Sequence, residues 1–360
     1  MVLIIRKLIS LLVCAAFLTA LHPAAHAREF PAIAAKSAVV MNTDGRILYG
    51  VNENEPLPMA STTKLMTALI AVERCDLDET VEIRADCCGL EGSSMYCKPG
   101  DRYTVRQLLC GLLLVSGNDA AMGLAVHAAG SETLFVDWMN DRARKLGMTN
   151  THFANPHGLS APGHCASAAD LGLLMAAFQR EDALMQIAGT RSTVIGEQTL
   201  VNHNKLLTRC PGCLAGKTGY TEEAGRCLVS CCERDGTRLL CVTLCDSEDW
   251  DDHCALYDWA FSRFSLRDLT GTLCYSVPVV SGDRTIVTVR AEPLSVFLPR
   301  DVEISAAAEL PRFVFAPVSE GETAGVVRFL LGGELVGESR LYYTETVQTE
   351  SREPIWRRRA

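Results

Sequence analysis

Three short segments of the chain contain residues that together could carry out nucleophilic catalysis. They are Ser61-x-x-Lys64, Ser116-Gly117-Asn118 and Lys217-Thr218-Gly219. Residues three apart on a helix share one face, so the first segment places a hydroxyl beside an amine. A lysine can remove the serine proton when burial and nearby positive charge lower the pKa of its amine. Taken alone, this pair is better explained as a helix cap followed by a surface lysine.

The other two segments change that interpretation. Ser116-Gly117-Asn118 separates two predicted helices, where its hydroxyl and amide can point into one cleft. Lys217-Thr218-Gly219 lies in a predicted strand, where the lysine offers a positive charge and Gly219 lets a substrate approach the backbone closely. The order S-x-x-K, S-x-N and K-T-G is the set found in serine β-lactamases and penicillin-binding proteins.

With the flanking residues, the chain resembles the low-molecular-weight penicillin-binding proteins of the D-alanyl-D-alanine carboxypeptidase family. The resemblance extends over essentially the whole exported chain, and the segments that carry it are residues 92–95, 114–121, 151–159, 202–207 and 217–221. It implies a β-lactamase/transpeptidase-like fold and a hydrolase that uses no cofactor and no metal.

By this resemblance, Ser61 attacks the carbonyl between the two terminal D-alanines of a peptidoglycan stem peptide, and Lys64 accepts its proton. An acyl-enzyme forms as D-alanine leaves. Ser116 relays a proton to the leaving amine, and Asn118 binds the substrate amide. β-Lactam antibiotics such as penicillins mimic this peptide, so they are expected to acylate Ser61 and inhibit the enzyme.

The resemblance also assigns substrate-binding roles around the third segment. Lys217 holds Ser116 and, with Thr218, meets the terminal carboxylate of the peptide. Gly219 allows the close approach, and the backbone N–H groups of Tyr220 and Ser61 form an oxyanion hole.

The chain departs from its relatives in one respect that concerns the same carboxylate. Relatives often carry an arginine shortly after the strand predicted at 238–245. This chain has Asp251, Asp252 and His253 in that region and no arginine. Carboxylate recognition is therefore expected from Lys217 with Thr218, from Arg226, or from another group.

Two other functions are compatible with parts of the pattern. A class A β-lactamase needs a deacylating glutamate, and no Glu-x-x-x-Asn segment separates the second and third motifs. A catalytically idle cell-wall-binding protein would have no use for a nucleophile and its base, yet both are intact in this chain.

The predicted elements describe an α+β domain followed by a small all-β one. Apolar spacing predicts a β-hairpin at 35–49, helices at 61–74, 104–115, 119–129, 131–146, 169–178 and 252–264, and strands at 215–221, 227–233 and 238–245. Strands at both ends with helices between them predict an antiparallel sheet that joins the two ends of the segment. The acidic run 246–252 is interpreted as a solvated loop.

Four segments are predicted along the chain. Residues 1–27 read as a signal peptide because Arg6 and Lys7 precede an apolar run that ends near Ala25-His26-Ala27. Residues 28–272 form the peptidase domain, residues 273–346 a β-rich domain and residues 347–360 a polar tail. The tail has no apolar stripe, so at most a weak peripheral membrane contact is expected, and the protein is expected to act outside the cytoplasm at the cell wall.

Composition narrows the class further. The apolar content of 48% fits a well-cored globular protein, and the net charge of −9 argues against a nucleic-acid partner. Removal of Cys14 with the leader would leave 15 of the 16 cysteines, an odd number that cannot pair completely. Free thiols that act as small hydrophobes are therefore expected. A local disulfide between Cys210 and Cys213 is an open alternative, whereas a zinc site at these two residues is not expected. His152, His157 and His203 are interpreted as structural.

Overall fold

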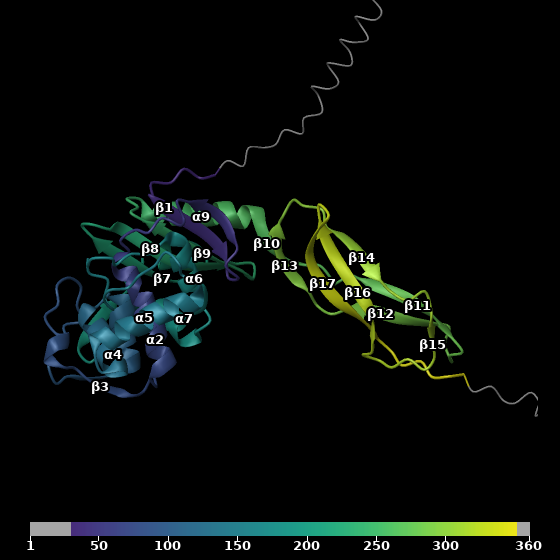
Figure 1. Ribbon diagram of the computed structural model, residues 1–360, viewed down its shortest axis with the longest axis horizontal. Helices are drawn as coiled ribbons and strands as arrows, with labels where there is room; N and C mark the ends of the chain where they lie inside the picture. The colour runs from purple at the N-terminus through teal and green to yellow at the C-terminus, as the bar shows by residue number, and fades with distance from the viewer. Residues whose placement is uncertain (1–29, 351–360) are drawn as a thin grey trace, which may run out of the picture. The chain divides into compact units, whose positions relative to one another are not determined.

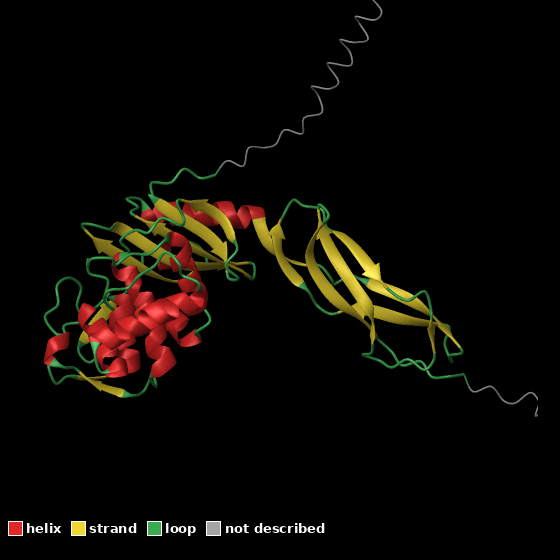
Figure 2. Ribbon diagram, viewed as in Figure 1, coloured by secondary structure: helices red, strands yellow, loops and turns green. Residues whose placement is uncertain are grey.

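We describe residues 30–350 of the computed structural model; the predicted leader 1–27 and the last ten residues of the predicted tail lie outside this part. Every helix and strand described belongs to the unit Ala34–Ala360 (Figure 1). This unit has the predicted α+β organisation, with helices and an antiparallel sheet followed by a strand-rich C-terminal region (Figure 2).

An antiparallel five-stranded sheet has the order β2-β1-β9-β8-β7. Its strands are β1 (Ser37–Asn42), β2 (Ile47–Val51), β7 (Cys213–Thr221), β8 (Gly225–Arg234) and β9 (Thr237–Leu244). Because β1 pairs with β9, with Val39 opposite Val242, the sheet joins the two ends of the segment as predicted. Strand β7, which carries the third motif, is left at an edge.

Helices cover both faces of this sheet. The longer ones are α2 (Lys64–Arg74), α3 (Val105–Leu114), α4 (Asn118–Ala129), α5 (Glu132–Leu146), α6 (Ala168–Phe178) and α9 (Asp249–Arg263). Gly172 of α6 lies against Met41 on one face, whereas His253 of α9 is hydrogen-bonded to Ser230 and Thr243 on the other. Burial of both faces explains why β1, β8 and β9 read as nearly continuous apolar runs.

Two predicted elements differ from the structure. The helix expected from residue 61 is a 3-10 turn, η1 (Ala60–Thr63), followed by α2. The acidic run is not a solvated loop, because α9 begins at Asp249 and the side chains of Asp246, Asp249 and Asp252 are buried. Those carboxylates have partners that a sequence pattern does not reveal: Asp252, for example, accepts the backbone N–H of Ala34 at 2.6 Å.

Several short elements were not predicted. They are β3 (Thr80–Glu82), η2 (Ala85–Cys87), β4 (Arg102–Thr104), α7 (Asp182–Ala188), β5 (Ser192–Ile195), β6 (Gln198–Val201) and α8 (Leu206–Arg209). Each has at most seven residues, too few for apolar periodicity to be distinctive.

The C-terminal region contains a six-stranded sheet of order β14-β16-β17-β12-β11-β15. Its strands are β11 (Cys274–Val280), β12 (Ile286–Ala291), β14 (Ser305–Glu309), β15 (Val314–Phe315), β16 (Thr323–Leu331) and β17 (Glu334–Tyr343). β10 (Phe264–Asp268) precedes the predicted boundary at 273 yet pairs with β13 (Ser295–Pro299) beyond it. Val347, in the predicted polar tail, is buried and forms a β-bridge with Val318.

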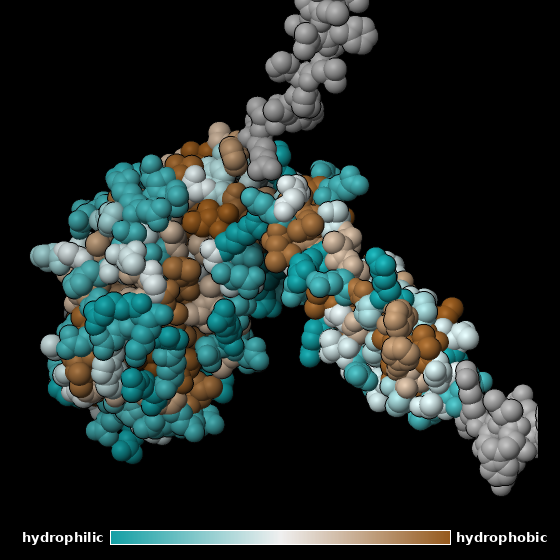
Figure 3. Space-filling view, turned by 45° about the vertical axis from the view of Figure 1, so that its right-hand side comes forward, coloured by the Kyte–Doolittle hydropathy of each residue, from teal (hydrophilic) through white to brown (hydrophobic). Residues whose placement is uncertain are grey.

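The surface and the cysteines agree with an ordinary globular chain. On the face seen in Figure 3, hydrophobic and hydrophilic residues are interspersed. Among the described residues no helix is long and apolar enough to cross a membrane. All fifteen described cysteines are free thiols, so Cys210 and Cys213 do not form a disulfide. Cys227, Cys231 and Cys241 are fully buried in the central sheet, where they serve as small hydrophobes as predicted.

Candidate active site

A cleft of about 610 Å³ brings the three motifs together. Six of the eight predicted site residues line it, namely Ser61, Ser116, Asn118, Thr218, Gly219 and Tyr220. The other two, Lys64 and Lys217, are at most 1% exposed, and each reaches a cleft residue with its amine. The cleft therefore presents hydroxyls and an amide to a ligand while both amines are shielded from water.

Lys64 lies within hydrogen-bonding distance of Ser61. Its Nζ is 2.9 Å from Ser61 Oγ, 2.7 Å from Asn118 Oδ1 and 2.5 Å from the backbone oxygen of His157. Ser61 belongs to the 3-10 turn and Lys64 is the first residue of α2, so the three-residue spacing places both groups on one side of this turn.

These partners determine which way the Ser61 proton points. Burial, and secondly the charge of Lys217, hold the pKa of Lys64 well below its ordinary value, which favours the neutral amine. A neutral amine has two N–H groups and one lone pair. Asn118 Oδ1 and the His157 carbonyl can only accept, so they take the two N–H groups. The lone pair is then left for the Ser61 hydroxyl, which is the arrangement of a nucleophile and its base.

Lys217 and Ser116 form a second amine–hydroxyl pair. Lys217 Nζ donates to Ser116 Oγ at 3.0 Å and to the Thr218 backbone oxygen at 2.7 Å. Burial lowers the pKa of Lys217 to about 7, so this amine is only partly charged at neutral pH.

The backbone is strained or tightly packed where these residues meet. Ala60 and Ser116 adopt left-handed φ angles of 48° and 62°, which are uncommon for residues with a side chain. A Cβ at Gly158 would lie 2.1 Å from the Ala60 oxygen, and one at Gly219 would lie 3.0 Å from Ser61 N. Only glycine lets these two segments pack against the turn that carries Ser61.

Comparison with known proteins identifies the family. Residues 24–248 match the family model described as D-alanyl-D-alanine carboxypeptidase. The chain belongs to this family. It is 30% identical to the D-alanyl-D-alanine carboxypeptidase DacF of Bacillus subtilis over 93% of this chain and 92% of the relative. It is 39% identical to DacB2 of Mycobacterium tuberculosis over 63% of this chain and 82% of the relative.

Comparison with a solved structure supports the same family and fold. Penicillin-binding protein 5 of Haemophilus influenzae superposes with a TM-score of 0.70 at 27% identity, over 89% of this chain and 99% of that one. The predicted family and transpeptidase-like fold are thus confirmed. The protein is a serine D-Ala-D-Ala carboxypeptidase of the low-molecular-weight penicillin-binding type.

In this carboxypeptidase, Asp119 is a residue of the site that sequence reasoning missed. Its carboxylate is buried and accepts the N–H groups of Met95 at 2.8 Å and Cys97 at 2.9 Å, and the Ser94 hydroxyl at 2.6 Å. The same loop supplies the Glu91 oxygen that accepts from Asn118 Nδ2. Asp119 therefore fixes the loop that orients Asn118. Its position directly after the second motif was the sequence feature that could have predicted a role in the site.

The histidines have different surroundings. The backbone oxygen of His157 holds Lys64, and the ring of His164 lies 2.8 Å from the Thr63 hydroxyl just beside it. His203 lines the cleft, and its backbone N–H donates to the Leu114 oxygen at 3.0 Å. His152 contacts the Gly163 oxygen, and this loop role agrees with the prediction.

One group with metal-ligand chemistry occurs among residues 30–350, away from the residues that line the cleft. Donor atoms of Cys75, Glu79 and His127 lie within 4.8 Å of one another. His127 Nε2 is 3.1 Å from Glu79 Oε1, and burial raises the pKa of the Cys75 thiol, which favours its protonated form. This group contributes nothing to the cleft.

Proposed function

We propose that the enzyme removes the terminal D-alanine from peptidoglycan stem pentapeptides through an acyl-enzyme on Ser61. The observation that carries this proposal is the position of the Lys64 amine, whose Nζ lies 2.9 Å from Ser61 Oγ and within 2.7 Å of two carbonyl oxygens. The family of the chain supports the substrate class.

Acylation begins when Ser61 Oγ bonds to the carbonyl carbon between the two D-alanines and its proton passes to Lys64 Nζ. The carbonyl oxygen becomes negative and accepts the N–H groups of Ser61 and Tyr220, each contributing about 3 kcal/mol to transition-state stabilisation. The close packing of Gly219 against Ser61 N supports an oxyanion hole at this point.

The peptide bond then breaks. The leaving nitrogen takes a proton, relayed from Lys64 through the Ser116 hydroxyl that Lys217 holds, and D-alanine departs. A water oxygen then bonds to the carbonyl carbon of the Ser61 ester, and the bond from that carbon to Ser61 Oγ breaks. One water proton passes through Lys64 Nζ to Ser61 Oγ, and the new carboxylic acid of the shortened peptide ionises by releasing its proton to solvent.

Substrate contacts follow from what the cleft leaves free. Asn118 Oδ1 is bound to Lys64 and its Nδ2 donates to the Glu91 oxygen, which leaves one amide N–H for a substrate carbonyl. Thr218 lines the cleft, and Lys217 Nζ donates to its backbone oxygen at 2.7 Å.

We also propose export and a modular chain. The charged and apolar pattern of the leader supports removal of residues 1–27. The rest of the chain would then consist of a peptidase domain at 28–272, a β-rich domain at 273–346 and a polar tail at 347–360 with at most weak membrane contact. The enzyme would then act outside the cytoplasm at the cell wall and be inhibited by β-lactams.

The test is to incubate purified protein with a stem pentapeptide and with penicillin, and to follow both by mass spectrometry. We expect release of one D-alanine and a lasting penicilloyl adduct that maps to Ser61 and is absent in Ser61→Ala. Rapid turnover of penicillin would indicate a β-lactamase instead. Muropeptide binding without turnover, unchanged in Ser61→Ala, would indicate a wall-binding protein.

A further inference from the structure

Arg226 brings a positive charge to the cleft from the second strand of the sheet. It lies opposite Tyr220 in the pairing of β8 with β7, so both side chains project from the same face. Because β7 is the edge strand, the Arg226 side chain reaches the cleft at this edge, and it lines the cleft together with Asp249 and Trp250 of α9.

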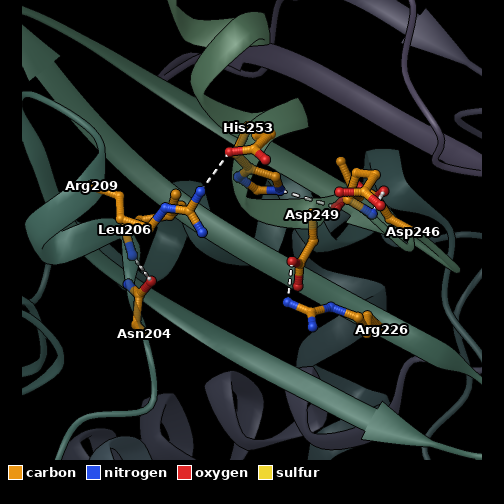
Figure 4. A network of polar contacts seen from close by, with 10 residues as sticks. Asn204, Leu206, Arg209, Arg226, Asp246, Asp249 and His253 are labelled. Atoms are coloured by element: carbon orange, nitrogen blue, oxygen red, sulfur yellow. Dashed lines mark hydrogen bonds and ion pairs between the residues drawn. The ribbon is translucent and has the colours of Figure 1, made fainter.

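Two residues at the start of α9 hold the guanidinium in place. Arg226 Nη2 donates to Asp249 Oδ1, as Figure 4 shows, and the guanidinium carbon lies 5.4 Å from the centre of the Trp250 ring. The Asp249 side chain is 3% exposed, whereas that of Arg226 is 40% exposed. Asp249 accepts from Nη2 of the guanidinium, and Arg226 Nε is buried without a hydrogen-bond partner among the described residues. The group is thus oriented while part of its donor set stays unused.

The other cations near the cleft are poorly placed for a ligand's negative charge. Both lysine amines are buried: Lys64 is held as a neutral base, and Lys217 Nζ already donates to Ser116 Oγ and to the Thr218 oxygen. Lys217 is moreover only partly protonated near its pKa of about 7, while an arginine stays charged. Arg226 is the one lysine or arginine among the residues described as lining the cleft.

A peptide that ends in D-alanine brings one obligatory negative charge to this cleft, its terminal carboxylate. We propose that Arg226, held by Asp249 and Trp250, binds that carboxylate and makes the enzyme selective for a free peptide terminus. This assignment rests on the proposed function, because it requires the peptide to occupy the cleft.

The test compares an acylated L-Lys-D-Ala-D-Ala peptide with the same peptide amidated at its C-terminus. Release of D-alanine and of D-alaninamide is measured by mass spectrometry, and the readout is the ratio of kcat/KM for acid over amide. Loss of hydrogen bonds to a charged group predicts that Arg226→Gln lowers this ratio about 10- to 100-fold, with little change for the amide. Arg226→Lys, which keeps the charge but loses the planar fork, should lower it about 3- to 10-fold.

Arg209→Gln is the matched control. Arg209 pairs with Asp251 in the same first turn of α9 at 2.7 Å and is 45% exposed, but it does not line the cleft. It should leave the ratio unchanged. Thermal unfolding checks that each variant folds. If Arg226→Gln does not fold, the measurement on Arg226→Lys decides the test.

An unchanged ratio in a folded Arg226 variant would overturn the assignment, and so would equal losses on acid and amide, which mark a structural role. Failure of the proposed function gives a different result, since the wild-type enzyme would then release neither D-alanine from the acid nor D-alaninamide from the amide.

Discussion

Two walls of the cleft each bury a lysine but give its amine different partners: a helical wall of η1, α2 and the start of α4, and a sheet wall of β7. In the helical wall, Lys64 has two carbonyl acceptors and one hydroxyl, a set that fits a neutral amine. In the sheet wall, Lys217 has one carbonyl and one hydroxyl and keeps a pKa of about 7. The helical wall therefore supplies a base, and the sheet wall supplies partial positive charge. Both amines are buried, but they differ in their hydrogen-bond partners and in the charge they face, since the charge of Lys217 also lowers the pKa of Lys64.

Removal of the base should have the largest effect. Lys64→Met leaves Ser61 without a proton acceptor, so acylation by penicillin should slow by about 10²- to 10⁴-fold, the usual contribution of general base catalysis. The measurement is the second-order rate constant of acylation, obtained from quenched reactions with labelled penicillin. Lys98→Met, at an exposed lysine, is the control and should acylate like the wild type.

Displacement of the turn that carries Ser61 should come next. In Gly158→Ala the new Cβ would lie 2.1 Å from the Ala60 oxygen, so η1 must move. A displacement near 1 Å predicts about a 100-fold loss in acylation rate. Gly130→Ala is a matched control, because Gly130 also has a positive φ but nothing lies within 4 Å of its added Cβ. Equal acylation rates in the two variants would contradict the packing argument.

Asp119 tests how the helical wall is held. Asp119→Asn replaces an acceptor of several N–H and O–H groups by an amide that must present its own donors to some of them. Unfolding in urea should show a loss of about 2–3 kcal/mol. Asp137→Asn, at an exposed position on α5, should stay within about 0.5 kcal/mol of the wild type. A stable Asp119→Asn variant would mean that the loop is fixed by other contacts.

The smallest effect is expected on the pH dependence of the acylation rate, which tests whether the amines of Lys64 and Lys217 interact. Acylation needs neutral Lys64, so its rate should rise with pH through the pKa of Lys64. The charge of Lys217 helps to lower that pKa, so Lys217→Met should move the rising limb to higher pH. A limb that stays in place or moves down would show that the amines do not interact. Lys205→Met, at an exposed lysine, should not move it.

Lys217 also predicts a change in stability with pH. Its pKa is about 7 in the folded protein against an ordinary value of 10.5. Between these values the unfolded chain binds the extra proton, so the free energy of unfolding should rise with pH in this window. The slope should be smaller in Lys217→Met, as urea titrations at several pH values would show.

Longer elements and the three motifs were predictable from the sequence because their patterns are local. Helices α3 to α6 and strands β7 to β9 follow from apolar spacing, and their motifs meet because β1 pairs with β9 and so joins the two ends of the segment 37–244. The burial of the acidic run was not predictable, since it depends on partners such as Arg226 and Ala34 that are distant in sequence. The same holds for Asp119, whose acceptor role depends on a loop more than twenty residues away.

The role of Lys64 as the neutral base for Ser61 can be measured directly. In protein labelled with ¹³C at the lysine ε-carbon, the Lys64 resonance is identified by its absence in Lys64→Met and followed by NMR as a function of pH. We predict a titration midpoint well below the ordinary value of 10.5, from the burial and charge around this amine. A midpoint at or above that value would mean that Lys64 is charged at working pH, and it would contradict this role.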